Sequence, residues 1–224
     1  MTLTPFLVLD HLVVAARTLE EGVHWLEART GATTVPGGRH ALMGTHNRLM
    51  ALGNGAYLEI IAIDTQAPPP ARARWFSLDA PAMRLRLAAG PALIHWVART
   101  GDIEAARAAF PDRVGEVLDL ERGEYQWRIG VPADGSLPAA GAFPALIQWQ
   151  GFRHPAAALP DSGCRLESLT VRSPGAGEHL ARLRQLGLAP DAPVRILEGA
   201  ATRLSAVLRS SRGVVLLPES AGGE

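Results

Sequence analysis

Apolar and polar residues follow the same order at two places in the chain, and this repeat is the first sign of its architecture. The pattern begins with a short apolar run, continues with a polar break, and ends with apolar residues at helical spacing. It occurs at residues 10–31 (DHLVVAARTLEEGVHWLEARTG) and again at 94–112 (IHWVARTGDIEAARAAFPD). A histidine stands at the start of each apolar run, His11 in the first and His95 in the second. Short apolar runs are typical of strands, and helical spacing predicts helices. The two segments are predicted to be equivalent strand–helix units.

Both predicted helices have a start signal at the same distance from the histidine. Thr18 follows His11 by seven residues, and Asp102 follows His95 by seven residues. Threonine and aspartate are good N-caps because their side-chain oxygens accept hydrogen bonds from free backbone N–H groups of the first turn. Glu21 stands three residues after Thr18, as a capping box requires. The caps support the equivalence of the two units.

Strand-like segments separated by turn signals follow the first helix. We expect strands around residues 32–35, 48–52 and 57–63. The breaks between them are PGG at 36–38 and GNG at 53–55, and the second of these is a good hairpin signal. The first unit therefore has the order β-α-β-β-β.

The same order is expected twice more. The second unit continues with strand-like segments near 115–120, 126–131 and 145–149. A third copy over residues 166–217 has a strand, a turn and a helix, followed by three strands.

Two segments interrupt the repeat. Residues 65–91 and 153–164 are rich in proline and alanine, and we expect both connections to lie on the surface. Trp75 and Phe76 in the first connection could form a lid, and we expect His154 in the second to be exposed.

Composition excludes several kinds of chemistry. The 22 basic residues balance 22 acidic residues, so no electrostatic footprint for nucleic acid or an anionic membrane is present. All 22 basic residues are arginine, which excludes a lysine Schiff base and a P-loop lysine. Cys164 is the single cysteine, so no intrachain disulfide can form. The N-terminus lacks a basic segment and its apolar run is interrupted at Asp10, so we expect neither signal peptide nor membrane span and a cytoplasmic location.

The motifs from His11 through GTHN (44–47) to YLEIIAID (57–64), and then LIQW (146–149), resemble the vicinal oxygen chelate superfamily, most of all its glyoxalase-like branch. The resemblance implies an α+β fold in which paired βαβββ modules form a curved mixed sheet around a cleft, with a third βαβββ-like copy at the C-terminus.

The domain organisation follows from the repeat. Residues 1–152 are expected to hold the paired modules, 1–64 and 91–152, joined by the long connection. Residues 164–220 are expected to form a module-like extension packed on the first two. In this copy a serine, Ser168, stands where His11 stands in the first, so the chemistry is expected within residues 1–152.

The resemblance also implies metal ligands on the first and last strands of each paired module. Carried over to this chain, these positions are His11 and Glu59 in the first module and His95 and Gln148 in the second. His11, Glu59 and His95 form the expected ligand set, and such a set suits a divalent ion such as Fe, Mn, Zn or Ni. Strand parity places His11 and Glu59 on inward faces, and a buried carboxylate needs a partner or a metal.

Glu59 is the expected catalytic residue, because it is the sole base among these four positions. Gln148 is a weak ligand and a poor base, so it is assigned to substrate binding, and its presence puts glyoxalase-type proton shuttling in doubt. Two alternatives stay open: His11 could bond Glu59 with no metal present, and His95 could serve packing beside Trp96.

The segment 37–47 (GGRHALMGTHN) is expected to be a polar loop beside the cleft. Arg39 and His46 could meet an anionic group of a substrate. The resemblance implies that Thr45 and Asn47 shape the pocket or hold substrate, whereas the alternative is that they cap their own backbone.

The leading hypothesis is a metal-dependent lyase, isomerase or dioxygenase that acts on a small oxygen-rich molecule in the cleft. The second is a metal-free protein that binds or sequesters a small molecule, and the third is a scaffold with an idle cleft. The expected partner is a small-molecule substrate, with no nucleic acid and no membrane, and a homodimer is an open alternative for its assembly.

Overall fold

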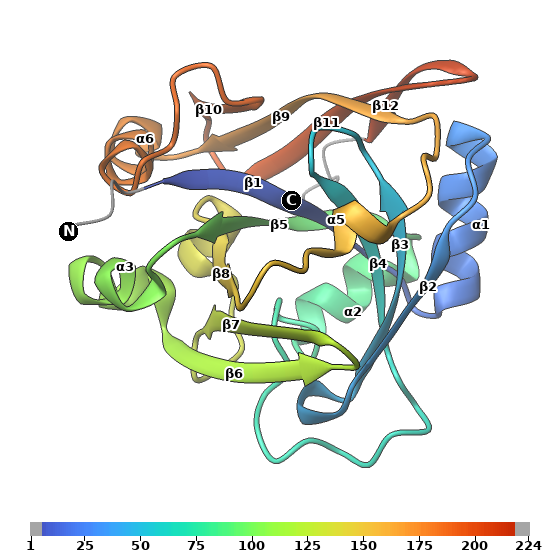
Figure 1. Ribbon diagram of the computed structural model, residues 1–224, viewed down its shortest axis with the longest axis horizontal. Helices are drawn as coiled ribbons and strands as arrows, with labels where there is room; N and C mark the ends of the chain where they lie inside the picture. Colours follow the sequence, from blue (N-terminus) through green and yellow to red (C-terminus); the bar gives the residue numbers. More distant parts are fainter. Residues whose placement is uncertain (1–5, 218–224) are drawn as a thin grey trace.

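The chain folds around a curled sheet of eight strands. A second sheet of four strands packs over one side of it (Figure 1). The computed structural model describes residues 6–217. The elements that build the first half of the eight-stranded sheet are β1 (Leu7–Ala15), α1 (Leu19–Thr30), β2 (Val35–His40), β3 (Thr45–Ala51) and β4 (Tyr57–Ile63). After α2 (Pro81–Ala88), the second half consists of β5 (Ala92–Thr100), α3 (Ile103–Ala109), α4 (Pro111–Val114), β6 (Glu116–Arg122), β7 (Tyr125–Val131) and β8 (Ala145–Trp149). Short 3-10 turns at Ala41–Met43 and Pro138–Gly141 complete these halves.

The two halves are equivalent in topology as well as in element order. The strand order β2-β3-β4-β1-β5-β8-β7-β6 places the two first strands, β1 and β5, side by side and antiparallel at the centre. Each first strand pairs in parallel with the last strand of its own half, β1 with β4 and β5 with β8. The expected paired βαβββ modules around one concave face are confirmed, and Figure 1 shows β6 curling toward β2 from the opposite side.

The expected helix caps are present in both halves. Thr18 accepts a hydrogen bond from the backbone N–H of Glu21, and Asp102 accepts one from that of Ala105. These bonds satisfy free donors of the first turn and fix where each helix begins. Gly31 ends α1 in a left-handed conformation, which glycine adopts without steric cost.

The third copy has the expected elements but a different pairing of strands. After α5 (Pro155–Ala158), it consists of β9 (Arg165–Ser173), α6 (Ala176–Gln185), β10 (Val194–Glu198), β11 (Arg203–Ser210) and β12 (Gly213–Leu217). Its strand order is β10-β9-β11-β12, so β9 pairs in parallel with the strand that follows its helix. In the other two copies the first strand pairs in parallel with the last. The third copy is therefore a βαβββ unit with its own topology.

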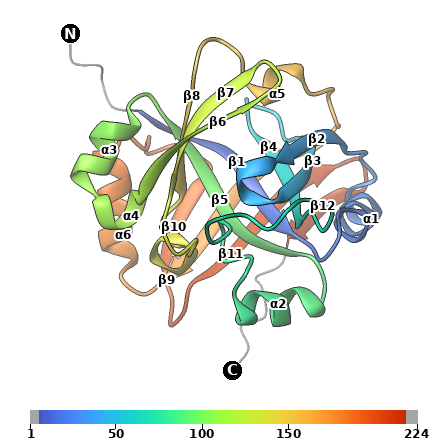
Figure 2. The ribbon, with the colours of Figure 1, turned by 90° about the horizontal axis from the view of Figure 1, so that it is seen from below.

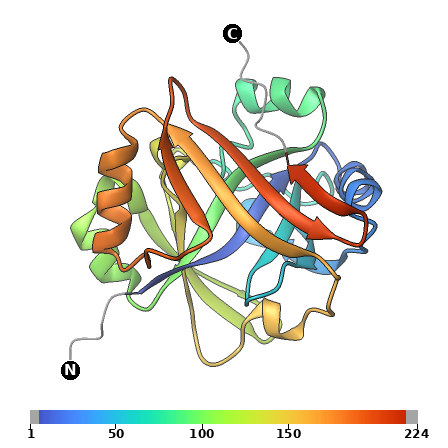
Figure 3. The ribbon, with the colours of Figure 1, turned by 90° about the horizontal axis from the view of Figure 1, so that it is seen from above.

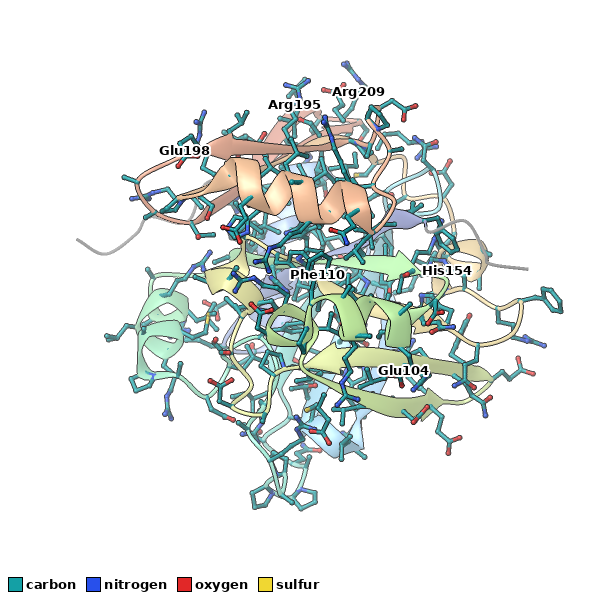
Figure 4. The ribbon with its side chains drawn as sticks, turned by 90° about the vertical axis from the view of Figure 1, so that its left-hand side faces the viewer. Glu104, Phe110, His154, Arg195, Glu198 and Arg209 are labelled. Atoms are coloured by element: carbon teal, nitrogen blue, oxygen red, sulfur yellow. The ribbon has the colours of Figure 1, made fainter. Side chains whose placement is uncertain are left out.

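The second sheet packs its apolar side on the convex face of the first sheet (Figure 3). Leu169 and Val171 of β9 and Leu204 of β11 share one apolar core with Leu12 of β1 and Trp96 of β5. Arg195 and Arg209 lie on the opposite, outer side of this sheet, and Phe110 lies between α6 and α3 (Figure 4). The second sheet thus supports β1 and β5 from behind and leaves their concave side free.

The first part of the long connection before β5, residues 65–74, lies on the surface as expected, but from Trp75 onward the connection turns inward. Trp75 and Phe76 are 4% and 5% exposed and pack on the concave face, together with Met83 and Leu87 of α2. A curled sheet presents an apolar inner face that must be covered, and this connection supplies the cover.

The segment 37–47 is also not a loop. Residues 35–40 form β2, an edge strand, and residues 45–51 form β3, joined by a 3-10 turn. PGG lies inside β2, where the pairing with β3 shifts register between Pro36 and Gly38. Proline and glycine are tolerated at an edge strand or a bulge, which is why these turn signals did not end the strand.

None of the helices formed by residues 6–217 combines the length and apolar character that a membrane span requires.

Candidate functional site

A small cavity of about 30 Å³ lies on the concave face of the eight-stranded sheet. Its polar lining consists of His11, His40, Asn47, Glu59 and Arg122. The larger part of its apolar lining is aromatic and consists of Tyr57, Trp75, Phe76, Trp127 and Trp149. Both halves of the sheet and the long connection contribute, so the cavity is the cleft expected between the modules. Its volume suits one or two water molecules.

A β-bulge in β1 brings Asp10 and His11 to the same side of the sheet. The pairing of β1 with β5 shifts between Leu9 and His11, so Asp10 has no partner in the ladder. The Asp10 carboxylate accepts hydrogen bonds from His11 Nδ1 at 2.7 Å, His154 Nε2 at 2.8 Å and Trp149 Nε1 at 2.9 Å. Burial acts to raise the pKa of Asp10, but the hydrogen bonds from the two histidines hold that pKa well below its usual value.

The bond to Asp10 determines which ring nitrogen of His11 faces the cavity. Because an ionised carboxylate can only accept, Nδ1 carries the proton and donates it to Asp10. Nε2 then lies 3.7 Å from Oε2 of Glu59. The ring of Tyr57 stacks on the imidazole with centroids 4.6 Å apart, and burial raises the pKa of Tyr57 well above its usual value, so the phenol stays neutral.

Glu59 is held at its other oxygen by an amide. Asn47 Nδ2 donates to Glu59 Oε1 at 2.5 Å, from the neighbouring strand β3. Glu59 is 5% exposed. The residues that strand parity placed on inward faces, His11 and Glu59, thus lie together, with one carboxylate oxygen engaged by an amide and the other directed at an imidazole.

His40 extends the polar cluster. Its Nε2 lies 3.4 Å from Asn47 Nδ2, and its Nδ1 lies 3.1 Å from Thr45 Oγ1. Burial lowers the pKa of His40 to about 4, so the ring is neutral at pH 7. The ring of Trp75 meets it edge-on at 5.0 Å.

His95 lies outside this cluster. It is fully buried on β5, its Nε2 accepts a hydrogen bond from the backbone N–H of Ala145 at 3.0 Å, and Phe76 lies 5.4 Å from its ring. Burial lowers its pKa to about 3, with His11 as a smaller cause. The Nε2 lone pair is therefore engaged with the backbone, and Nδ1, which carries the proton in this tautomer, has no hydrogen-bond partner within residues 6–217.

Gln148 also has a structural position rather than a place in the cavity. Ile147 and Trp149 on either side of it line the cavity. Gln148 points to the opposite side of β8, where its Oε1 accepts from the N–H of Ile103 at 3.0 Å and its Nε2 donates to the carbonyl of Gly101 at 2.9 Å. It ties β8 to the start of α3, contrary to the expectation that it contacts a substrate.

Arg39 and His46 face away from the cavity as well. They line an open hollow between the β2–β3 pair and α1. Arg39 donates to Gln66 and its Nε lies 3.4 Å from Asp64. Of the four residues expected to bind substrate, Asn47 lines the cavity, whereas Arg39, His46 and Gln148 do not.

The donors around His11 do not fit the three-ligand metal site that the resemblance implies. His11 and Glu59 supply two neighbouring donors. The third expected ligand, His95, uses its Nε2 to accept a backbone hydrogen bond. Within residues 6–217, no group of three or more histidine, cysteine, aspartate or glutamate side chains is arranged to hold a metal ion.

Nothing in the sequence indicated that three polar residues belong to the site region, and His40 was placed in a polar segment without any indication of a role for it. Asp10 alternates with His11 in a regular strand, so parity placed it on the other face, and the bulge left no signal in the sequence. Arg122 stands at the end of β6 in a charged turn that resembles any solvated hairpin. His154 was expected to be exposed, but its side chain is 17% exposed and bonds Asp10. The one sequence signal that the long connection covers the concave face was its pair of aromatic residues, Trp75 and Phe76.

Comparisons with known proteins agree with this architecture. The family model described as a glyoxalase-like domain matches residues 9–187. A hypothetical protein from Staphylococcus aureus has 16% sequence identity and a TM-score of 0.58, with 88% of each chain covered. Methylmalonyl-CoA epimerase from Mycobacterium tuberculosis has 17% identity and a TM-score of 0.42, with 68% of this chain and 94% of that chain covered. No curated protein matches the chain. The chain belongs to the glyoxalase-like domain family.

Proposed function

We propose that this protein is an isomerase or lyase that removes a proton from a small oxygen-rich molecule, with Glu59 as the general base. The observation that carries the proposal is the buried pair of Glu59 Oε2 and His11 Nε2, 3.7 Å apart and open to a cavity. A carboxylate that borders a cavity and is shielded from bulk water is typical of an acid–base site.

The hydrogen bonds around the pair support distinct roles for its members. Asn47 holds Oε1 of Glu59, which leaves Oε2 to accept a proton from a substrate carbon. When that C–H bond breaks, its electron pair moves to the neighbouring carbonyl, whose oxygen becomes negative. Arg122 borders the same cavity and can donate hydrogen bonds to this oxygen, and His11 can do so from Nε2 when both of its ring nitrogens carry protons. Return of the proton at another position gives an isomer, and loss of a leaving group gives a lyase product.

Asp10 is the positioning residue in this scheme. Its three hydrogen bonds hold a buried carboxylate against the far side of the His11 ring. A carboxylate in this place fixes both the tautomer and the orientation of a histidine. The nitrogen that meets the substrate is therefore set before binding.

The proposal contains no metal-dependent step, because the described donors do not complete a metal site. A substrate larger than a water molecule also needs more room than about 30 Å³. Trp75 and Phe76 belong to a connection rather than to the sheet, so their displacement is the simplest way to make that room. Phe76 and Ser77 both have a positive φ, 58° and 57°, which stores strain in this segment.

The test is exchange of substrate protons with solvent. Wild-type protein is incubated in D₂O with a panel of small 2-oxo and 2-hydroxy carbonyl compounds, and deuterium uptake is followed by NMR. Glu59→Gln should lower the exchange rate by about 10²- to 10⁴-fold, whereas Glu121→Gln, an exposed glutamate, should leave it unchanged. Exchange that survives dialysis against EDTA supports the metal-independent form. Equal exchange by wild type and E59Q would refute the role of Glu59.

A metal-free binding function is the second candidate, and the aromatic lining of the cavity favours it. Five aromatic side chains surround the polar cluster, and such a lining suits a flat, apolar ligand. Titration with flat aromatic compounds, followed by tryptophan fluorescence, separates the two candidates. Tight binding without proton exchange on any compound of the panel supports the binding protein.

A further inference from the structure

A second hollow adjoins the cavity and shares two residues with it. It has a volume of about 360 Å³ and lies between β2, the turn that joins β6 to β7, and α5. Figure 2 shows this turn beside α5. Leu49 and Arg122 line both the hollow and the cavity. These shared residues place the hollow next to the cavity that Glu59 lines.

The glycines of β2 make room for the side chains at this boundary. A Cβ atom at Gly38 would lie 2.3 Å from Cδ of Arg122, and one at Gly37 would lie 2.0 Å from Oδ1 of Asn47. Real Cβ atoms do not approach other atoms so closely, so larger residues would displace both side chains. The two glycines therefore allow Arg122 and Asn47 to lie against the backbone of β2.

Most hydrogen-bond donors of Arg122 are not engaged with the protein. Its Nη1 donates to Asn47 Oδ1 at 3.3 Å, and its guanidinium lies 5.8 Å from the centre of the Tyr125 ring. Within residues 6–217 no carboxylate forms an ion pair with it; the nearby Glu124 pairs with Arg153 at 2.5 Å. A guanidinium has five N–H donors in a planar fork that matches a carboxylate.

We propose that this hollow, which we call the vestibule, binds a small carboxylic acid, and that Arg122 holds its carboxylate. Val35, Pro36, Leu49 and Leu159 line the vestibule and would contact the apolar body of the acid. The inference deepens the proposed function and rests on it for the reacting end of the molecule.

The hydrogen-bond chain through Asn47 limits the shape of this acid. Arg122 donates to one end of the Asn47 amide, and the other end donates to Glu59. One amide group therefore separates the anion site from the base. The acidic C–H of the substrate should lie within one or two bonds of its carboxylate carbon.

A matched pair of probes tests the site without knowledge of the substrate. 3-Phenylpropanoate and its neutral amide, 3-phenylpropanamide, have the same shape and differ in charge. Binding to wild type, Arg122→Gln, Arg107→Gln and Glu59→Gln is measured by calorimetry. Wild type should prefer the acid by about tenfold, because a charge-assisted pair is lost with the amide. R122Q should reduce this preference to about twofold or less, whereas R107Q, which removes an equal charge from α3 outside the vestibule, should retain it.

The variant at Glu59 separates this inference from the proposed function. If E59Q still prefers the acid, and wild type exchanges substrate protons whereas E59Q does not, both the anion site and the proton transfer are supported. Preference for the acid without proton exchange in any variant supports the anion site and refutes the proton transfer. Equal binding of acid and amide by wild type, no binding of either, or an unchanged preference in R122Q would overturn the assignment of Arg122.

Discussion

In the first module the histidine of the first strand and the acidic residue of the last strand both reach the cavity, whereas in the second module the residues expected at the matching positions, His95 and Gln148, serve the fold. His11 and Glu59 lie 3.7 Å apart beside open volume. His95 is fully buried and accepts a backbone hydrogen bond, and Gln148 ties β8 to α3. Both modules keep the same strand pairing, so a shared topology does not imply shared chemistry.

The difference begins at one residue. The register between β1 and β5 shifts twice, and each shift omits the residue before the histidine, Asp10 in β1 and Ile94 in β5. The two modules thus have the same bulge in the same place. In the first, the bulged residue is a carboxylate that orients His11; in the second, it is an isoleucine buried in the inner core. A bulge can redirect a side chain. The type of residue at the bulge decides whether the histidine that follows it becomes part of a site.

The largest expected effect follows from removal of the charge at this bulge. Asp10→Asn replaces an acceptor of three hydrogen bonds with a group that must also donate, so one donor is left facing an N–H group. Loss of one member of a buried charged cluster costs about 3–5 kcal/mol. We expect the free energy of unfolding, measured by urea denaturation, to fall by that amount.

The control for this variant is Asp191→Asn, at an exposed aspartate, which should change stability by less than about 0.5 kcal/mol. Proton exchange by folded D10N protein should also decrease, because His11 loses its orientation. Wild-type stability in D10N would mean that Asp10 does not hold the cluster.

The second prediction concerns the pH dependence that the buried histidine of the second module gives to stability. Burial lowers the pKa of His95 from 6.5 to about 3, so the folded protein keeps this ring neutral while the unfolded chain takes up a proton below pH 6.5. The stability that the neutral His95 ring contributes to the folded protein is therefore fully present above pH 6.5 and is lost as the pH falls toward 3. Between pH 7 and pH 5 the loss is about 2 kcal/mol.

His95→Gln isolates this contribution, because glutamine can accept the hydrogen bond from Ala145 but cannot be protonated. Unfolding free energies at pH 7 and pH 5 should differ by about 2 kcal/mol less in H95Q than in wild type. His24→Gln, at an exposed position, should leave the difference unchanged. If H95Q and wild type lose equal stability, His95 is protonated in the folded state and the contrast between the modules weakens.

The sequence was sufficient for features that depend on neighbours along the chain. The N-caps at Thr18 and Asp102 and the hairpin turn at 53–55 follow from local chemistry, and the structure has all three. The repeat of these signals was enough to predict paired modules. Parity along β4 was also sufficient to direct Glu59 inward, because β4 has no bulge.

Features that depend on packing between distant segments were not predictable in the same way. The glycines at 37 and 38 resemble a turn signal, but they accommodate Asn47 and a side chain from β6, 84 residues further along the chain. The bulge at Asp10 exists because of the pairing between β1 and β5. Parity counted from an unbroken strand therefore failed beside the site itself.

The smallest expected effect comes from giving the second module the carboxylate that the first module has. Gln148→Glu retains an acceptor for the N–H of Ile103 but loses the donor to the carbonyl of Gly101, and it places a negative charge against that carbonyl. Loss of one hydrogen bond of this kind costs about 1 kcal/mol. Gln150→Glu, two residues along the strand end and exposed, should change stability by less than about 0.5 kcal/mol. Both variants should exchange substrate protons at the wild-type rate, because neither side chain reaches the cavity. Faster proton exchange in Q148E, or metal retention that wild type lacks, would show that the second module can present its last strand to the cavity as the first module does. The asymmetry between the two modules would then lie in one side chain rather than in the geometry of the strand.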